Sequence, residues 1–155
     1  MAGNVKPIPD GYHAVTPYLI VNDGARALEF YQRAFGAKER MRMRQPDGRI
    51  GHAEVQIGDS RIMLADEFPE MDARSPKSIG GSPVSIMLYV EDVDAVFQQA
   101  IAAGARGVRP VADQFYGDRL GSLEDPFGHK WHIATHTEDL SLDEIKKRAA
   151  AAKAG

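Results

Sequence analysis

Residues 21–37, VNDGARALEFYQRAFGA, decide the fold because residues 90–105, VEDVDAVFQQAIAAGA, repeat their pattern. In both segments an aspartate, Asp23 or Asp92, stands where a helix N-cap is expected, and a glycine stands where the helix should end. The apolar residues between them recur at helical spacing. The repeat predicts an internal duplication with two amphipathic helices. The side chains expected beneath these helices are Leu28, Tyr31, Phe97 and Ile101.

A short strand is expected before each helix, and three more strands are expected after it. TPYLIV at 16–21 and SIMLYV at 85–90 are rich in the branched and aromatic residues typical of strands. Residues 37–65 alternate polar with apolar side chains and contain the turn sequences PDG and GDS. Residues 105–136 behave similarly around the turn DPFG. Each half therefore has the predicted order βαβββ.

The chain length and these segments indicate one domain, residues 1–155, assembled from two modules. The capping-box pattern of Ser141 and Glu144 also predicts a helix near the end of the chain. The expected parts are module one at about 12–67, a linking loop at 68–83, module two at about 84–139 and the C-terminal helix at about 141–153.

Composition excludes several classes of function. The chain has 19 Lys and Arg against 22 Asp and Glu, so it offers no broad basic surface for nucleic acid or an anionic membrane. It contains no cysteine, which excludes disulfides, thiolate metal ligands and a cysteine nucleophile. The first residues lack the features of a signal peptide, and no apolar run has the length of a membrane span. We expect a cytoplasmic protein.

Two βαβββ modules that end in the hairpin DPFGHKWHIA, residues 125–134, resemble the vicinal oxygen chelate superfamily of glyoxalases, bleomycin-resistance proteins and extradiol dioxygenases. The resemblance covers residues 12–139 and favours the glyoxalase/bleomycin-resistance-like branch. It implies an α+β fold in which the modules form a U-shaped mixed sheet. Helices would cover the convex side, and the concave side would hold a ligand cavity.

The same resemblance implies where a metal would be bound. Members of the glyoxalase type take one ligand from the first and one from the last strand of each module. The residues at these positions are Thr16, Met63, Ser85 and His132. Hydroxyl and thioether groups are poor ligands for divalent ions, so we expect neither the standard metal site nor any cofactor.

A different metal site is the alternative. His52 and Glu54 share one strand face, and His132 and His136 share another. If both faces line one cavity, three imidazoles and a carboxylate could hold Fe, Ni, Zn or Mn.

Strand alternation predicts which side chains line the cavity. Its aromatic and apolar walls are expected from Tyr18, Met87, Tyr89, Phe115 and Tyr116. Its polar part should come from Arg119, His132 and His136, because the strands on either side of the DPFG turn lie side by side. Arg119 would pair with a ligand oxygen, Tyr116 would stack on a ring, and a histidine would supply a hydrogen bond that is switchable near neutral pH.

These observations favour a homodimeric protein that binds a small planar or aromatic ligand without the standard metal site. The alternative is a divalent-metal-dependent lyase, isomerase or dioxygenase that acts on a substrate with vicinal oxygens. A third class is an assembly module that uses the C-terminal helix and the sheet edges. The sequence assigns no catalytic residue, so enzymatic activity remains open.

Overall fold

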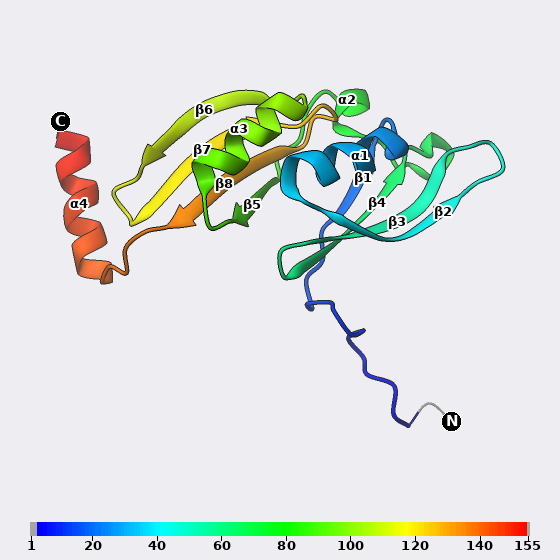
Figure 1. Ribbon diagram of the computed structural model, residues 1–155, viewed down its shortest axis with the longest axis horizontal. Coiled ribbons are helices and arrows are strands. Elements are labelled where there is room, and N and C mark those ends of the chain that lie inside the picture. Colours follow the sequence, from blue (N-terminus) through cyan, green and yellow to red (C-terminus); the bar gives the residue numbers. More distant parts are fainter. Residues whose placement is uncertain (1–2, 155) are drawn as a thin grey trace. The chain divides into compact units, whose positions relative to one another are not determined.

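Two four-stranded mixed sheets, each with a helix on one face, form the core of the fold in a computed structural model that describes residues 3–154 (Figure 1). The chain divides into two compact units, residues 1–81 and 82–155, and the division falls inside the predicted linking loop. The predicted α+β class and the two βαβββ modules are confirmed. Within the described residues, no helix is long and apolar enough to cross a membrane.

Module one lies in the first unit. Its elements are β1 Tyr18–Val21, α1 Gly24–Phe35, β2 Lys38–Arg44, β3 Ile50–Ile57 and β4 Ser60–Asp66. The strand order is β1-β4-β3-β2, with β1 parallel to β4 and the other pairs antiparallel. The loop that follows holds a 3-10 turn at Pro69–Met71 and the short helix α2 at Pro76–Ile79.

Module two repeats this topology in the second unit. Its elements are β5 Ser85–Tyr89, α3 Val93–Ala103, β6 Arg106–Asp113, β7 Asp118–Glu124 and β8 Lys130–His136, followed by α4 Leu142–Ala154. The strand order is β5-β8-β7-β6, and β5 is parallel to β8. The predicted duplication is therefore present in both strand order and strand direction.

Both long helices begin and end at the residues that the repeat predicts. The side chain of Asp23 accepts a hydrogen bond from the backbone N–H of Arg26, and that of Asp92 accepts one from Ala95, both at 3.1 Å. These bonds satisfy backbone donors that a helix leaves without an intrahelical partner. Gly36 ends α1 with a φ of 67°, a conformation that glycine adopts without steric cost.

The core of module one is closed beneath α1. Leu28 and Tyr31 are buried against the sheet, as predicted. Asp66 at the end of β4 fixes the start of the helix, because its carboxylate accepts the backbone N–H groups of Gly24 at 2.7 Å and Ile50 at 2.6 Å. This carboxylate ties the helix to two strands.

The core of module two is less covered by its helix. Phe97 of α3 packs over Gly121, where a Cβ atom would come within 2.9 Å of the Phe97 ring, so the glycine makes room for the aromatic side chain. Ile101 lies over Gly107 of β6 but remains 39% exposed. At the start of α3, the hydroxyl of Thr135 accepts the N–H of Val93 and donates to the carbonyl of Val90.

The DPFG turn is a structural hairpin, as predicted. One carboxylate oxygen of Asp125 accepts the N–H groups of Phe127 and His129, at 2.9 and 3.0 Å. The other accepts the indole N–H of the buried Trp131 at 3.0 Å. Trp131 therefore has the packing role that strand alternation predicts, with its polar atom satisfied.

Candidate functional site

One residue from each strand of module two contributes to a row across the sheet. Met87 of β5 is the register partner of His132 of β8, His132 is that of Ser122 of β7, and Ser122 is that of Arg109 of β6. Register partners project from the same face of a sheet. Trp131 and Ile133, which alternate with His132, are buried in the core. The row therefore lies on the face opposite α3, which we call the open face of module two.

A cavity of about 230 Å³ lies over this row. Its lining residues are Met87, Arg109, Pro110, Gln114, Tyr116, Leu120, Ser122 and His132. An irregularity in β6 contributes to its shape: Arg109 pairs with Ser122, whereas Ala112 pairs with Leu120, so β6 has one residue more than β7 over this stretch. Such bulges bend a strand and redirect its side chains. Pro110 is tolerated there because β6 is an edge strand.

The cavity has one permanently charged side chain in its lining, that of Arg109. Among the described residues, no carboxylate lies within ion-pair distance of its guanidinium group. Ser122 Oγ lies 2.7 Å from Nδ1 of His132, which leaves Nε2 as the ring nitrogen available to a ligand. The guanidinium of Arg109 and the imidazole of His132 can both donate hydrogen bonds to a ligand. The cavity therefore suits a ligand oxygen with negative charge or carbonyl character.

A second polar group on the same sheet centres on the buried carboxylate of Asp118. Its oxygens accept the hydroxyl of Tyr89 and contact Nδ1 of His136, both at 2.8 Å, and Asp139 lies 2.8 Å from His136 Nε2. The hydrogen bond to Asp118, and then that to Asp139, raises the pKa of His136. Burial, and then the negative charge of Asp118, raises the pKa of Tyr116, so its phenol stays protonated in the cavity wall.

Arg119 is engaged away from the cavity. Its guanidinium donates to both carboxylate oxygens of Asp94 on α3, at 2.8 and 2.9 Å, and to Asp113 at 3.2 Å. Asp118 and Arg119 therefore face opposite sides of β7, as alternation predicts. The structure does not bring Arg119 to the lining of the cavity, and Arg109 supplies the cation there.

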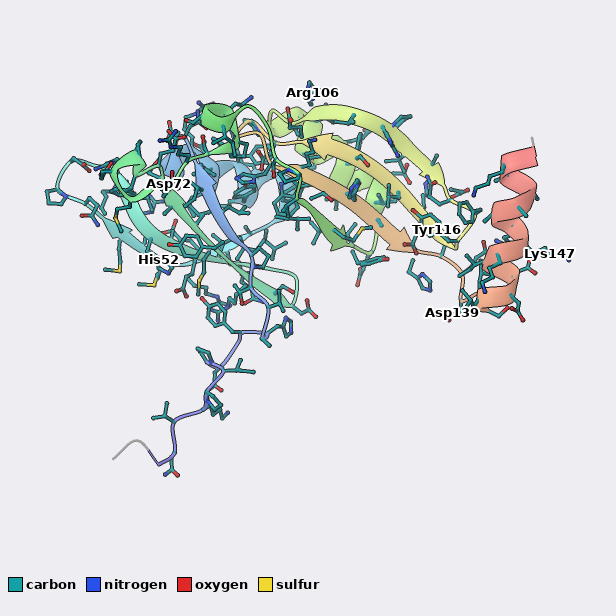
Figure 2. The ribbon with its side chains drawn as sticks, turned by 180° about the vertical axis from the view of Figure 1, so that it is seen from behind. His52, Asp72, Arg106, Tyr116, Asp139 and Lys147 are labelled. Atoms are coloured by element: carbon teal, nitrogen blue, oxygen red, sulfur yellow. The ribbon has the colours of Figure 1, made fainter. Side chains whose placement is uncertain are left out.

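The other predicted site residues lie in four different surroundings. Met87, Tyr116 and His132 line the cavity. Tyr89 and His136 bind Asp118 on the same sheet, whereas Phe115 is exposed with its ring edge-on to Tyr116. Tyr18 belongs to module one. Figure 2 labels Tyr116 in the turn that joins β6 to β7.

Five lining residues were not predicted from the sequence, namely Arg109, Pro110, Gln114, Leu120 and Ser122. A proline inside a strand indicates an edge strand or a bulge, so Pro110 is the one sequence signal for the irregular shape of β6. The register that carries Arg109 to the open face depends on the bulges in β6, which alternation alone does not predict.

On module one, four side chains form a continuous hydrogen-bonded chain. Tyr18 Oη lies 2.8 Å from Nδ1 of His52, and Nε2 of His52 lies 2.8 Å from a carboxylate oxygen of Glu54. The other oxygen of Glu54 accepts the hydroxyl of Tyr12. The hydrogen bond from Tyr12, and then that from His52, lowers the pKa of Glu54, which is therefore a carboxylate at neutral pH.

Within residues 3–154, no three His, Asp or Glu side chains come together as a metal site. On the parallel strand pairs, Met63 is the register partner of Tyr18, and His132 is the register partner of Met87. Neither pair offers two good ligands for a divalent metal ion. The alternative set of His52, Glu54, His132 and His136 is divided between the two units, and it stays a prediction.

Comparison with known proteins agrees with this architecture. The family model of the Glyoxalase/Bleomycin resistance protein/Dioxygenase superfamily matches residues 12–133. An uncharacterized protein of Mycobacterium tuberculosis strain H37Rv is 44% identical over 149 residues, which cover 94% of this chain and 84% of the relative.

Two solved structures are similar throughout most of their length. TioX from Micromonospora sp. ML1 is 27% identical with a TM-score of 0.62, and the match covers 83% of this chain and all of TioX. A gene product from Arabidopsis thaliana is also 27% identical, with a TM-score of 0.64, and the match covers 79% of this chain and 98% of that protein.

Proposed function

The chain belongs to the Glyoxalase/Bleomycin resistance protein/Dioxygenase superfamily, and we propose that it binds a small planar ligand in the module-two cavity without the standard metal site. Ligand binding of this kind needs a concave site in which apolar or flat walls accompany a few polar groups that converge. The cavity over Met87, His132, Ser122 and Arg109 has these features.

The observation that carries the proposal is the guanidinium of Arg109. It lines the cavity, and among the described residues it has no carboxylate partner. A hydrogen bond between a guanidinium and an anionic or carbonyl oxygen is stronger than one between neutral groups. Arg109 is therefore the group most suited to fix the oxygen end of a ligand.

The remaining walls indicate the shape of the ligand. Met87, Pro110, Tyr116 and Leu120 present apolar or flat surfaces, and the volume of about 230 Å³ is smaller than that of most drug-sized sites. A single aromatic ring, or a comparably flat group, fits these walls. The ligand class is therefore a small aromatic carboxylate, phenol, vicinal diol or 1,2-dicarbonyl.

Thermal-shift measurements with salicylate, catechol and 1-phenylpropane-1,2-dione test this proposal. We expect at least one compound to stabilise the wild-type protein, since a ligand that binds only the folded state raises its stability. Arg109→Met should remove the shift. The matched control Arg119→Met should keep it, because Arg119 is held by Asp94 outside the cavity. A shift of equal size in Arg109→Met would contradict the proposal.

A chelator separates this function from the metal-dependent alternative. We expect protein that has been treated with EDTA and then desalted to bind the same compounds with unchanged affinity, because the lining offers Arg109 and His132 rather than a set of divalent-metal ligands. Loss of binding after EDTA, with recovery on addition of Fe, Ni, Zn or Mn, would favour the lyase, isomerase or dioxygenase alternative.

A further inference from the structure

Three of the chain's six methionines lie on one face of the module-one sheet, beside a histidine and a carboxylate. Met41 and Met63 are both register partners of Glu54, and Met43 is the partner of His52. The residues that alternate with His52 and Glu54 on β3, such as Ala53 and Val55, are buried in the core. We call the group of Met41, Met43, Met63, His52 and Glu54 the methionine face.

Two of the three methionines on this face are exposed and do not pack in the core. Met41 is 38% exposed and Met43 is 54% exposed, although methionine is usually an interior side chain. Both come from β2, which is an edge strand. Figure 2 shows side-chain sulfur atoms beside the labelled His52. Flexible, polarizable sulfur atoms are therefore accessible next to an imidazole.

His52 is oriented as a metal-binding histidine would be. Nε2 lies 2.8 Å from a carboxylate oxygen of Glu54, so that oxygen is placed to accept the Nε2 proton. Nδ1 then carries the lone pair that accepts the hydroxyl of Tyr18 at 2.8 Å. A histidine that binds a metal through one nitrogen commonly donates its other N–H to a carboxylate.

The combination of donors selects the type of ion. Thioether sulfur is a soft ligand that favours Cu(I), whereas Zn²⁺, Mn²⁺ and Mg²⁺ favour imidazole, carboxylate or water. We propose that the methionine face of module one is a binding site for a soft monovalent metal ion, Cu(I), held by Nδ1 of His52 and by thioether sulfurs of Met41, Met43 and Met63. Tyr18 occupies Nδ1 when no ion is bound.

The site is specific to module one. The register of module two places Arg109 and Ala112 on β6 where module one has Met41 and Met43 on β2, and places His132 on β8 where module one has Met63 on β4. No thioether occupies these positions in module two. The proposal is independent of the ligand cavity, so failure of either proposal leaves the other standing.

Ag(I), a redox-inert probe of Cu(I) sites, tests the proposal directly. We expect one equivalent of Ag(I) to shift the methyl NMR signals of Met41, Met43 and Met63 in protein labelled at the methionine methyl groups. The signals of Met71, in the loop that follows module one, and Met87, in module two, are the internal controls and should stay in place. Because the chain has no cysteine, thiolate binding cannot produce the effect. Zn²⁺ should leave all five signals unchanged.

Four variants test which side chains bind the ion or orient its ligands. Met43→Leu keeps the size of the side chain, removes the sulfur and should weaken Ag(I) binding, whereas Met71→Leu should have no effect. Glu54→Gln should weaken binding by about 10–100-fold, as expected for the loss of a carboxylate that orients a ligating histidine. Tyr18→Phe should strengthen binding, because the ion no longer competes with the hydroxyl for Nδ1.

Tyr18→Phe separates a metal site from a merely structural network. At a metal site, loss of the Tyr18 hydroxyl strengthens binding of the ion, whereas in a structural network the same loss would only weaken the network. Affinities are measured by competition titration under anaerobic conditions with Cu(I), and folding of each variant is checked by circular dichroism. Unchanged affinity in Met43→Leu, equal shifts for Met71 and the methionine face, or Zn²⁺ binding as tight as that of Ag(I) would each overturn the proposal.

Discussion

The two modules have the same strand order and the same helix caps but different chemistry on their open faces. The row across module one is Tyr18, Met63, Glu54 and Met41, whereas the row across module two is Met87, His132, Ser122 and Arg109. The first row contains a carboxylate and two thioethers, and the second an imidazole and a guanidinium. The repeated caps and core positions maintain the fold, which leaves the open-face positions free to diverge.

The modules also differ in how completely their helices close the core. Tyr31 of α1 is fully buried, whereas Ile101 of α3 is 39% exposed. We therefore expect a large asymmetry in stability. Tyr31→Ala should cost ~3–5 kcal/mol, in the range of other large aromatic truncations. Ile101→Ala should cost less than about 1.5 kcal/mol, because the side chain is only partly removed from water.

Urea unfolding followed by circular dichroism measures both losses. Trp131, the only tryptophan, lies in module two, so its fluorescence reports that module separately. Equal losses for the two variants would mean that α3 is as tightly packed as α1, against the exposure described above.

Besides its aspartate N-cap, each helix start is held by a second group, which differs between the modules. Asp66 accepts two buried N–H groups in module one, whereas Thr135 accepts one and donates one in module two. Asp66→Asn should cost about 1.5–3 kcal/mol because hydrogen bonds to charged groups are stronger, and Thr135→Val about 0.5–1.5 kcal/mol. The same urea experiment checks the order, and a larger loss for Thr135→Val would contradict it.

Repetition made the fold predictable from the sequence. Asp23, Asp92 and the glycines that end the helices carry local signals that do not depend on distant contacts. The site was less predictable because it depends on register. Met87 and His132 follow from strand alternation, whereas Arg109 reaches the cavity through bulges in β6 that alternation does not encode. The guanidinium of Arg119 could bind a ligand oxygen equally well, but it is paired with Asp94 of α3, on the face of the sheet away from the cavity.

The exposed ion pairs of Arg119 should contribute little to stability, which gives a smaller expected effect. Arg119→Met should lower the free energy of unfolding by urea only slightly, because its ion pairs with Asp94 and Asp113 are exposed to solvent. The change should become smaller still in high salt, which screens exposed charges. A loss of stability that persists unchanged at high salt would mean that Arg119 acts through packing instead.

The smallest expected effect is a change in the pKa of His136. Asp118 and Asp139 raise it above the ordinary value of 6.5, so their stabilising contribution is complete below that value and disappears as pH rises through the higher folded pKa. Asp118→Asn should lower the pKa of His136 more than Asp139→Asn does, because the bond to Asp118 is the larger cause. NMR titration of the imidazole measures both, and the reverse order would contradict the described network.

On the proposed function, module two, and not module one, holds the organic ligand. Methyl NMR of the labelled methionines tests it in one spectrum, because Met87 lines the module-two cavity while Met41, Met43 and Met63 lie on module one. On titration with a compound that gives a thermal shift, we expect the Met87 signal to move and the three module-one signals to stay in place. Movement of Met41, Met43 or Met63 with Met87 unchanged would contradict it.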